Sequence, residues 1–192
     1  MVMKILRKYR LPLYILTHPF DGFYAMKYQN EGTLKLAFFN LFLLILANMI
    51  NLQYTSLIVT QQNPLTLNSI NNVSIMLAML ALFCISNWSV TSLTDGEGRL
   101  KDIFMSICYA MTPLIFTVLL ATLVSRGISV EEVGFYNMIL TVGVVYFVFL
   151  VFCGLVVVHN YGAVKSVVTI FLTFVAMATI VFLIALLFTL WQ

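Results

Sequence analysis

Charged residues are scarce in this chain. Asp, Glu, Lys and Arg make up only 9% of its 192 residues, whereas an ordinary soluble domain has about 25%. Hydrophobic residues make up 62%, which is more apolar surface than a soluble fold of this length can bury. A bilayer removes that difficulty because it acts as the apolar solvent. The composition therefore indicates an integral membrane protein in contact with the lipid bilayer, and it leaves no basic soluble face for nucleic acid.

Cysteine is scarce too, and none of the three cysteines lies in a metal-binding or redox pattern. We expect all three to be buried as small hydrophobic residues. The chain contains no HExxH and no GxSxG motif, and no charged residue lies deep in its apolar stretches. The second absence argues against a proton-coupled pump or a channel for charged ions. The sequence predicts a non-enzymatic protein with no catalytic site, no metal ligands and no cofactor.

Long apolar runs are the main feature that is present. A membrane-spanning helix needs about 20 mostly apolar residues, and five stretches meet this length. They are residues 34–59, 70–93, 103–124, 135–158 and 167–190. The links between them are short, which makes neighbouring helices antiparallel. We therefore predict an all-α membrane protein in which residues 34–192 form a compact bundle of five transmembrane helices and residues 1–33 precede it.

The basic residues are distributed unevenly over the predicted links. Cytoplasmic loops of membrane proteins carry an excess of Lys and Arg. With the amino terminus inside, nine of the ten basic residues are cytoplasmic and Arg126 alone is outside. The nine are Lys4, Arg7, Lys8, Arg10, Lys27, Lys35, Arg99, Lys101 and Lys165. We therefore expect the amino terminus in the cytoplasm and the carboxyl terminus outside.

Residues 1–33 have the pattern of a short amphipathic segment at the membrane interface. Pro19 suits the first turn of a helix, Asp21 would lie near its positive end, and Gly32 is a candidate for its end. Four aromatic residues follow at helical spacing and are expected to share one face: Phe20, Phe23, Tyr24 and Tyr28. An aromatic face with basic flanks suits a helix in the headgroup layer. The alternative is that these aromatic residues pack under the bundle.

A few polar residues interrupt the apolar stretches. They are Asn40, Asn48, Asn87 and Thr112. Each needs a hydrogen-bond partner in hydrocarbon, so we expect them to point into the bundle and join helices. The alternative is a polar lining for a substrate path. Pro113 should kink the third span and free a carbonyl one turn earlier, near Tyr109.

The most informative polar link has the sequence TDGEGRLKD, over residues 94–102. Gly96 and Gly98 allow a tight reversal, and the charges, which include Arg99 and Lys101, have both signs. The link is therefore neither a phosphate-binding loop nor a polybasic lipid patch. We interpret it as a solvated hairpin or as a docking site for a partner.

This hairpin is followed by Cys108-Tyr109-Ala110-Met111-Thr112-Pro113. A glycine-containing turn, a basic residue and a tyrosine with a proline four residues on thus occur early in the third of five spans. The pattern resembles the Yip-domain family (Ypt-interacting proteins). Residues 18–27 and 160–165 are also similar to its bacterial branch, and the resemblance covers about residues 18–190. Eukaryotic members carry an acidic-aromatic-glycine-proline signature in a longer cytosolic domain, and we expect neither in this protein.

The resemblance implies a five-helix membrane protein and, for bacterial relatives, a role beside larger assemblies such as nutrient transporters of the ABC type. It transfers five positions as structural or docking residues: Gly96, Gly98, Lys101, Tyr109 and Pro113. We therefore expect an accessory or scaffolding subunit of the bacterial cytoplasmic membrane. Its partner would be a membrane protein or further copies of the chain. The docking surface would combine residues 1–33, 94–102 and 159–166.

Two other functions are less well supported. The first is a transporter or lipid-translocating protein for a neutral or amphipathic substrate, with a path lined by Asn48, Asn87, Tyr109 and the kink at Pro113. The second is an intramembrane enzyme that uses Glu131 or His159. No base, nucleophile and orienting group can be placed together on one side of the membrane, so we rank the enzyme last.

Overall fold

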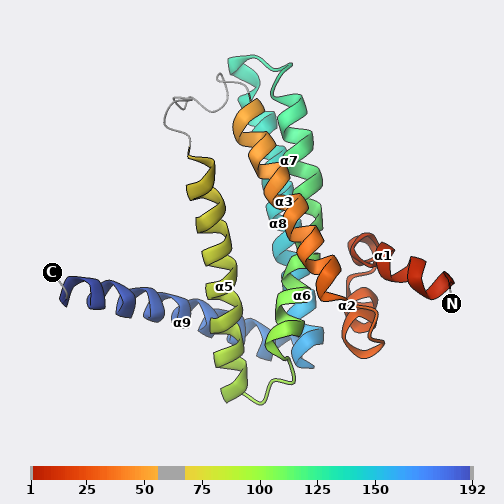
Figure 1. Cartoon of the computed structure of the whole chain (residues 1–192), viewed down its shortest axis with the longest axis vertical. Helices are drawn as coiled ribbons and strands as arrows, with labels where there is room; N and C mark the ends of the chain where they lie inside the picture. The colour runs from red at the N-terminus through yellow and green to blue at the C-terminus, as the bar shows by residue number, and fades with distance from the viewer. Residues whose placement is uncertain (1, 56–67, 191–192) are drawn as a thin grey trace.

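All regular secondary structure in the described part of the chain is helical (Figure 1). The computed structural model describes residues 2–55 and 68–190, apart from the side chains of residues 2–9 and of Val130. Within these residues, five helical segments are long and apolar enough to cross a membrane. They are α3 (Leu34–Tyr54), α5 (Ser69–Leu93), α6 with α7 (Leu100–Ala110 and Thr112–Val124), α8 (Val133–His159) and α9 (Ala163–Leu190). The predicted all-α fold with five spans is confirmed.

Two helices begin earlier than their apolar stretches predict. α6 begins at Leu100 rather than at residue 103, so Lys101 lies in its first turn and not in a loop. α9 begins at Ala163 rather than at residue 167, so Lys165 is also helical. Asp102 in the first turn of α6 complements the positive end of that helix, although it lowers the local hydropathy. Residues 60–67 of the predicted link over residues 60–69 lie outside the described residues.

The amino-terminal segment forms two helices, α1 (Val2–Thr17) and α2 (Pro19–Tyr28). α2 starts with Pro19 and carries an acid in its first turn, as predicted. It ends four residues before Gly32, because Asn30 adopts a left-handed conformation with φ of 53° and turns the chain. The amides of Glu31 and Gly32 then donate back to the carbonyls of Ala25 and Met26.

The predicted aromatic face of α2 is divided between two environments. Phe23 is fully buried, whereas Phe20, Tyr24 and Tyr28 are 40–52% exposed. The latter three are spaced four residues apart and share a face, while Phe23 lies on the side that packs against α8. The assignment of all four to one face was therefore wrong. Packing under the bundle applies to Phe23, and a place in the headgroup layer stays a prediction for the other three.

The third span is broken at Met111, which joins α6 to α7. Pro113 stands in the first turn of α7, where its missing N–H is tolerated. The carbonyls released by the break are taken up by side chains. The hydroxyl of Thr112 donates to the Tyr109 carbonyl at 2.7 Å, and the amide of Asn40 donates to the Cys108 carbonyl at 2.5 Å. The predicted kink and its free carbonyl are confirmed.

The five spans are not packed equally. The α6–α7 span is the most buried and packs against α8 and α3, while α9 is the least buried. α5 packs mainly against α9, and in Figure 1 it leans away from α3 and α8. α9 itself runs outward past α5, and its residues 181–190 are all exposed. The buried residues of α9 are Ser166, Thr169 and Thr173, all in its first half, and the largely apolar remainder buries no face against the protein.

An apolar cleft of about 660 Å³ lies between α5, α6, α8 and α9. Its lining includes Leu80 and Phe83 from α5, Met111 at the broken span, Phe152 from α8 and Phe174 from α9. A smaller pocket of about 320 Å³ lies between α3 and α5 and is lined partly by Asn48, Asn51 and Asn72. Met76 lines both spaces, so the two adjoin.

Candidate functional site

The loop of residues 94–99 connects α5 to α6 and turns tightly after Thr94. Asp95 adopts the left-handed conformation, with φ of 59°. The amides of Thr94 and Gly96 donate back to the Thr91 carbonyl, which closes the end of α5. Neither Gly96 nor Gly98 has a positive φ, so the reversal does not depend on the conformational freedom of glycine.

Glycine is required at positions 96 and 98 because the loop packs closely against His159 and Tyr161. A Cβ atom on Gly98 would lie 2.5 Å from Cε1 of His159, and one on Gly96 would lie 2.7 Å from the Tyr161 hydroxyl. Such distances essentially never occur in proteins. The loop therefore lies directly on the end of α8, and any side chain at these positions would displace it.

His159 lies beneath this loop and is hydrogen-bonded inside the protein. Its Nε2 lies 2.9 Å from Oδ1 of Asn87. Because an amide oxygen only accepts, Nε2 carries the proton and donates. The Asn87 amide nitrogen in turn donates to the Thr173 hydroxyl at 3.1 Å. All three side chains are buried, and this chain of hydrogen bonds joins α8, α5 and α9.

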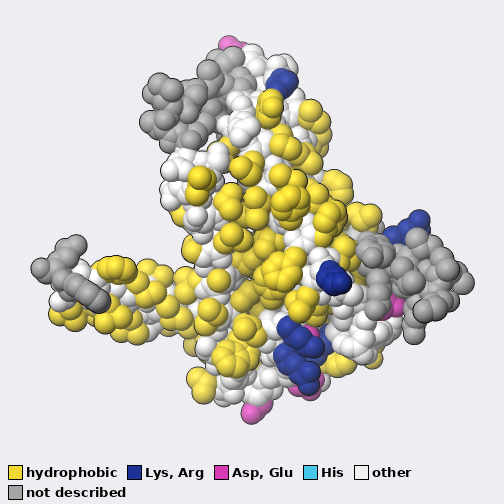
Figure 2. All heavy atoms as spheres, viewed as in Figure 1, with side chains coloured by type: hydrophobic (Ala, Val, Ile, Leu, Met, Phe, Trp, Pro, Cys, Tyr) yellow, Lys and Arg dark blue, Asp and Glu magenta, His cyan; other side chains and the backbone are white. Residues whose placement is uncertain are grey.

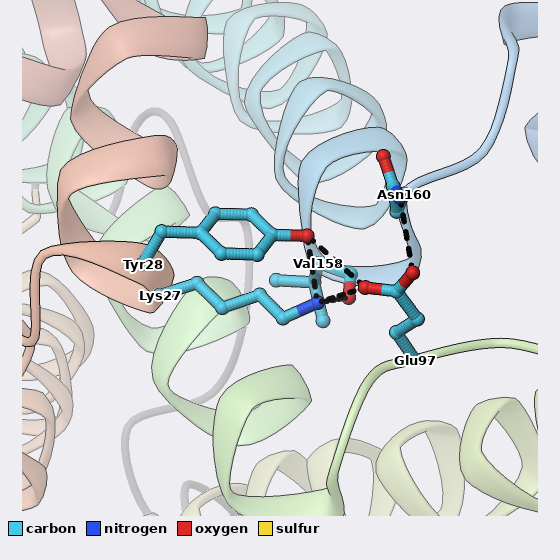
Figure 3. A network of polar contacts seen from close by, with 5 residues as sticks. All are labelled: Lys27, Tyr28, Glu97, Val158 and Asn160. Carbon is cyan, nitrogen blue, oxygen red and sulfur yellow. Dashed lines mark hydrogen bonds and ion pairs between the residues drawn. The ribbon is translucent and has the colours of Figure 1, made fainter.

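Glu97 holds three distant segments together at the surface (Figure 3). Its carboxylate accepts from Nδ2 of Asn160 at 3.0 Å, from the Tyr28 hydroxyl at 3.3 Å and from Nζ of Lys27 at 3.5 Å. Lys27 also donates to the Val158 carbonyl at 2.6 Å. These contacts link α2, the 94–99 loop and the end of α8.

The environment of Glu97 stabilises its charged form. The hydrogen bond from Asn160 and the positive charge of Lys27 hold the pKa of the Glu97 carboxyl below its ordinary value. The Glu97 side chain is 53% exposed, whereas the side chain of Lys27 is only 11% exposed. Lys27 is thus a largely buried cation that contacts both Glu97 and a helix-terminal carbonyl, whose partial charge is negative.

Further charged residues surround this contact and point outward. Asp95, Arg99 and Lys101 are exposed in the loop and in the first turn of α6. Figure 2 shows Lys and Arg side chains close to acidic ones at the lower edge of the molecule. We call the surface formed by α2, residues 94–101 and residues 160–162 the charged end. Asp21 is exposed in the first turn of α2 but takes no part in the contacts of Glu97.

Tyr109 and Pro113 do not belong to this surface, because both are buried. The Tyr109 hydroxyl donates to the Thr33 carbonyl and accepts from the Thr33 amide, each at 3.0 Å. Thr33 precedes α3, so Tyr109 fixes the start of that helix against α6. In this conformation a partner could reach Tyr109 and Pro113 only by displacing the surrounding helices.

The intramembrane amides differ in their surroundings. Asn87 is 1% exposed and bonds across helices, as does Asn40. Asn48 is half-buried, lines the smaller pocket and donates to the Leu44 carbonyl of its own helix. The expected bonding between helices is therefore confirmed for Asn40 and Asn87. The hydrogen bond of Asn48 lies within α3, and among the described residues it makes none to another helix.

The residues considered for an enzyme are separated. Glu131 precedes α8 and His159 ends it, so about 40 Å of helix lies between them. Next to Glu131, the carboxylate of Glu132 accepts from the amide and the hydroxyl of Ser129 and caps a short 3₁₀ helix, η2 (Val130–Glu132). Among the described residues, no group of three or more His, Cys, Asp or Glu side chains is arranged to hold a metal ion.

Three members of the charged end had no individual role in the sequence interpretation: Lys27, Tyr28 and Asn160. In the sequence, Lys27 is one of several basic residues and Tyr28 is one of four aromatic residues at helical spacing. Asn160 follows α8 in the left-handed conformation, with φ of 55°, and an Asn at the end of an apolar stretch, two residues before Gly162, is the one local signal. The partners lie 63–131 residues apart in the sequence, so no spacing rule could have paired them.

Comparison with known proteins gives one finding. The model of the Yip1 domain family matches residues 13–188. The match includes α2, the 94–99 loop, the broken third span and most of α9. Neither a curated protein nor a solved structure matches the chain.

Proposed function

Because the chain belongs to the Yip1 domain family, a family of membrane proteins, we propose that it is a non-enzymatic accessory or scaffolding subunit that docks a partner membrane complex through the charged end. The observation that carries this proposal is the set of contacts around Glu97. It joins three segments from separate parts of the chain into one surface. Arg99 and Lys101 are exposed members of that surface.

Fixing a surface in advance favours binding. Association costs free energy when loops and side chains must be ordered, and a surface that is already held by hydrogen bonds avoids part of that cost. Exposed charges of both signs add specificity, since a partner must match their arrangement. A uniformly basic surface would bind an anionic bilayer, but the charged end carries charges of both signs. We therefore propose that it binds a protein partner with complementary charges.

The proposal also includes the orientation of the chain in the membrane and the kind of partner. The excess of Lys and Arg supports an orientation with the charged end in the cytoplasm and the carboxyl terminus outside. The resemblance to bacterial members supports the cytoplasmic membrane as location and a nutrient transporter of the ABC type as partner. A homo-oligomer is the other assembly that the proposal admits.

Transport of a neutral or amphipathic substrate has less support. Of the residues expected to line a path, Asn48 lines one of the two pockets described above. Asn87 and Tyr109 line neither, and their polar groups are engaged in hydrogen bonds within the protein. The specific observation in favour of this function is the apolar cleft beside Met111.

The proposal is tested by gentle purification from native membranes and mass determination of the intact complex. We expect a stoichiometric partner with the wild-type chain and its loss with the double variant Arg99→Ala/Lys101→Ala. Arg126→Ala is the matched control, because Arg126 is an exposed basic residue in the link between α7 and α8. A monomer in the wild-type sample, or equal loss of the partner in the control, would contradict the proposal.

A further inference from the structure

The apolar cleft differs from an ordinary packing defect in its size and position. Its volume of about 660 Å³ lies within the range of small-molecule pockets, roughly 300–1,000 Å³. Its walls come from α5, α6, α8 and α9, all of which belong to segments long and apolar enough to cross a membrane, and from Met111 in the break between α6 and α7. The space therefore lies at the depth of the hydrocarbon layer, where lipid chains are the surrounding solvent.

The cleft is open to the side. Several of its lining side chains are also strongly exposed, including Met79 at 56%, Val148 at 58% and Phe174 at 55%. Hydrophobic side chains cover much of the middle of the molecule in Figure 2. The lining is thus continuous with the surface that contacts the bilayer, so a lipid chain can enter without crossing a polar barrier.

The adjoining smaller pocket has a different chemistry. Asn48, Asn51 and Asn72 line it together with apolar residues, whereas the lining of the large cleft is almost wholly apolar. Asn72 lies in the first turns of α5, and Asn51 lies in the last turn of α3. Together the two spaces form one amphipathic site: an apolar chamber that leads to uncharged amides near the helix ends.

The dimensions of this site match one leaflet. From Asn72 to Phe83 the two pockets follow α5 for about 17 Å, and half of the hydrocarbon layer is about 15 Å. At the same end, the Arg126 guanidinium lies 5.3 Å from the ring centre of Tyr54. Both are exposed, and an aromatic and a basic residue in contact are typical of the membrane interface.

We propose that this amphipathic site binds one membrane lipid, with an acyl chain in the cleft between α5 and α8 and its hydrogen-bonding headgroup at the amides of Asn48 and Asn72. Apolar walls and amides without charge fit a lipid whose headgroup offers hydrogen-bond donors and acceptors. The inference does not depend on the docking proposal, because the cleft and the charged end use different residues. The lipid would also fill the space that leaves α5 with few contacts to α3.

The experiment is native mass spectrometry of the purified full chain, titrated with palmitoyl-oleoyl phosphatidylethanolamine. We expect one retained lipid per protomer. Val148→Trp places an indole in the cleft and should weaken retention at least tenfold. Leu183→Trp is the matched control, because Leu183 is exposed on α9 and does not line the cleft. Met79→Trp fills the cleft from the opposite wall and gives the same test if Val148→Trp does not fold.

The headgroup position is tested with a second probe, a diacylglycerol with the same chains. Asn72→Leu should weaken binding of the phosphatidylethanolamine more than that of the diacylglycerol, and equal losses would overturn the headgroup assignment. Equal lipid retention by wild type and Val148→Trp would overturn the site itself. Conversion of a wild-type dimer into a monomer by Val148→Trp would also overturn it, since the cleft would then hold a second copy of the chain.

Discussion

Gly98 lies against the ring of His159 without room for a side chain. We predict that Gly98→Ala lowers the free energy of unfolding by about 1–3 kcal/mol, the cost of overpacking a well-packed site. The ring cannot yield easily, because Asn87 holds it by a hydrogen bond. Thermal denaturation in detergent measures the effect. Gly162→Ala is the control, since a Cβ at Gly162 meets nothing within 4 Å, and an equal loss in both variants would refute the packing argument.

Glu97 makes the stability of the charged end depend on pH. Its pKa is lowered from the ordinary value of 4.5 by the Asn160 hydrogen bond and by Lys27, so the folded state binds its proton less readily than the unfolded state. The resulting stabilisation is fully present above pH 4.5 and is lost as the pH falls through the lowered value. We predict that the melting temperature of wild type exceeds that of Glu97→Gln at pH 5–7 and that this difference shrinks below pH 4.5.

The comparison with Glu97→Gln isolates this group. Glu132 also has a lowered pKa, caused by the amide and hydroxyl of Ser129, and its contribution has the same sign. Both proteins retain Glu132, so its effect cancels in the difference. A difference between wild type and Glu97→Gln that stays constant from pH 7 to pH 3 would show that the contacts of Glu97 do not stabilise the fold.

At the scale of elements, Asn87 fixes α5 to both α8 and α9. Asn87→Leu leaves the Nε2–H of His159 without its acceptor, and we predict a destabilisation of about 1–2 kcal/mol. A double-mutant cycle with Thr173→Val should be non-additive, because the two side chains share a hydrogen bond. Asn137→Leu, at an exposed position of α8, should have little effect.

The opposite pattern would favour transport. If Asn87→Leu were as stable as Asn137→Leu but abolished flux of a solute or lipid in reconstituted vesicles, Asn87 would act in a path rather than in packing. Thermal denaturation and vesicle flux on the same preparations distinguish the two roles.

The helices themselves could be predicted largely from the sequence. Twenty apolar residues in lipid must satisfy their backbone hydrogen bonds internally, so the five spans follow from hydropathy. The kink at Pro113 follows from a missing N–H in the same way. The ends of α6 and α9 could not be predicted from hydropathy, because Lys101 and Lys165 are charged but helical. The direction in which α9 leaves the other helices was also not predictable, because its second half is almost uniformly apolar.

At the scale of the whole molecule, the orientation in the membrane can be measured directly. The three native cysteines are buried, so they should react slowly with a membrane-impermeant maleimide. We predict that a cysteine at position 101 reacts only after the inner face is exposed, and that one at position 126 reacts from outside. Both positions are exposed in the structure. The reverse pattern of labelling would contradict the orientation proposed from the Lys and Arg distribution.

The charged end could be predicted only in part. The sequence indicated the 94–102 link, because two glycines and mixed charges in a short connection are unusual within so apolar a chain. It did not indicate that Lys27 reaches a carbonyl 131 residues away or that Asn160 bonds Glu97. Such contacts depend on how α2 packs under α8, which is decided by the burial of Phe23 and not by any local pattern.

The central claim is that the charged end holds a partner in the native membrane. Its most direct test is photo-crosslinking in intact cells, with a photoreactive amino acid placed at position 101 or, as control, at position 126. We predict a single crosslinked protein from position 101 and none of the same mass from position 126. Absence of any crosslink at position 101, or the same product from both positions, would contradict it.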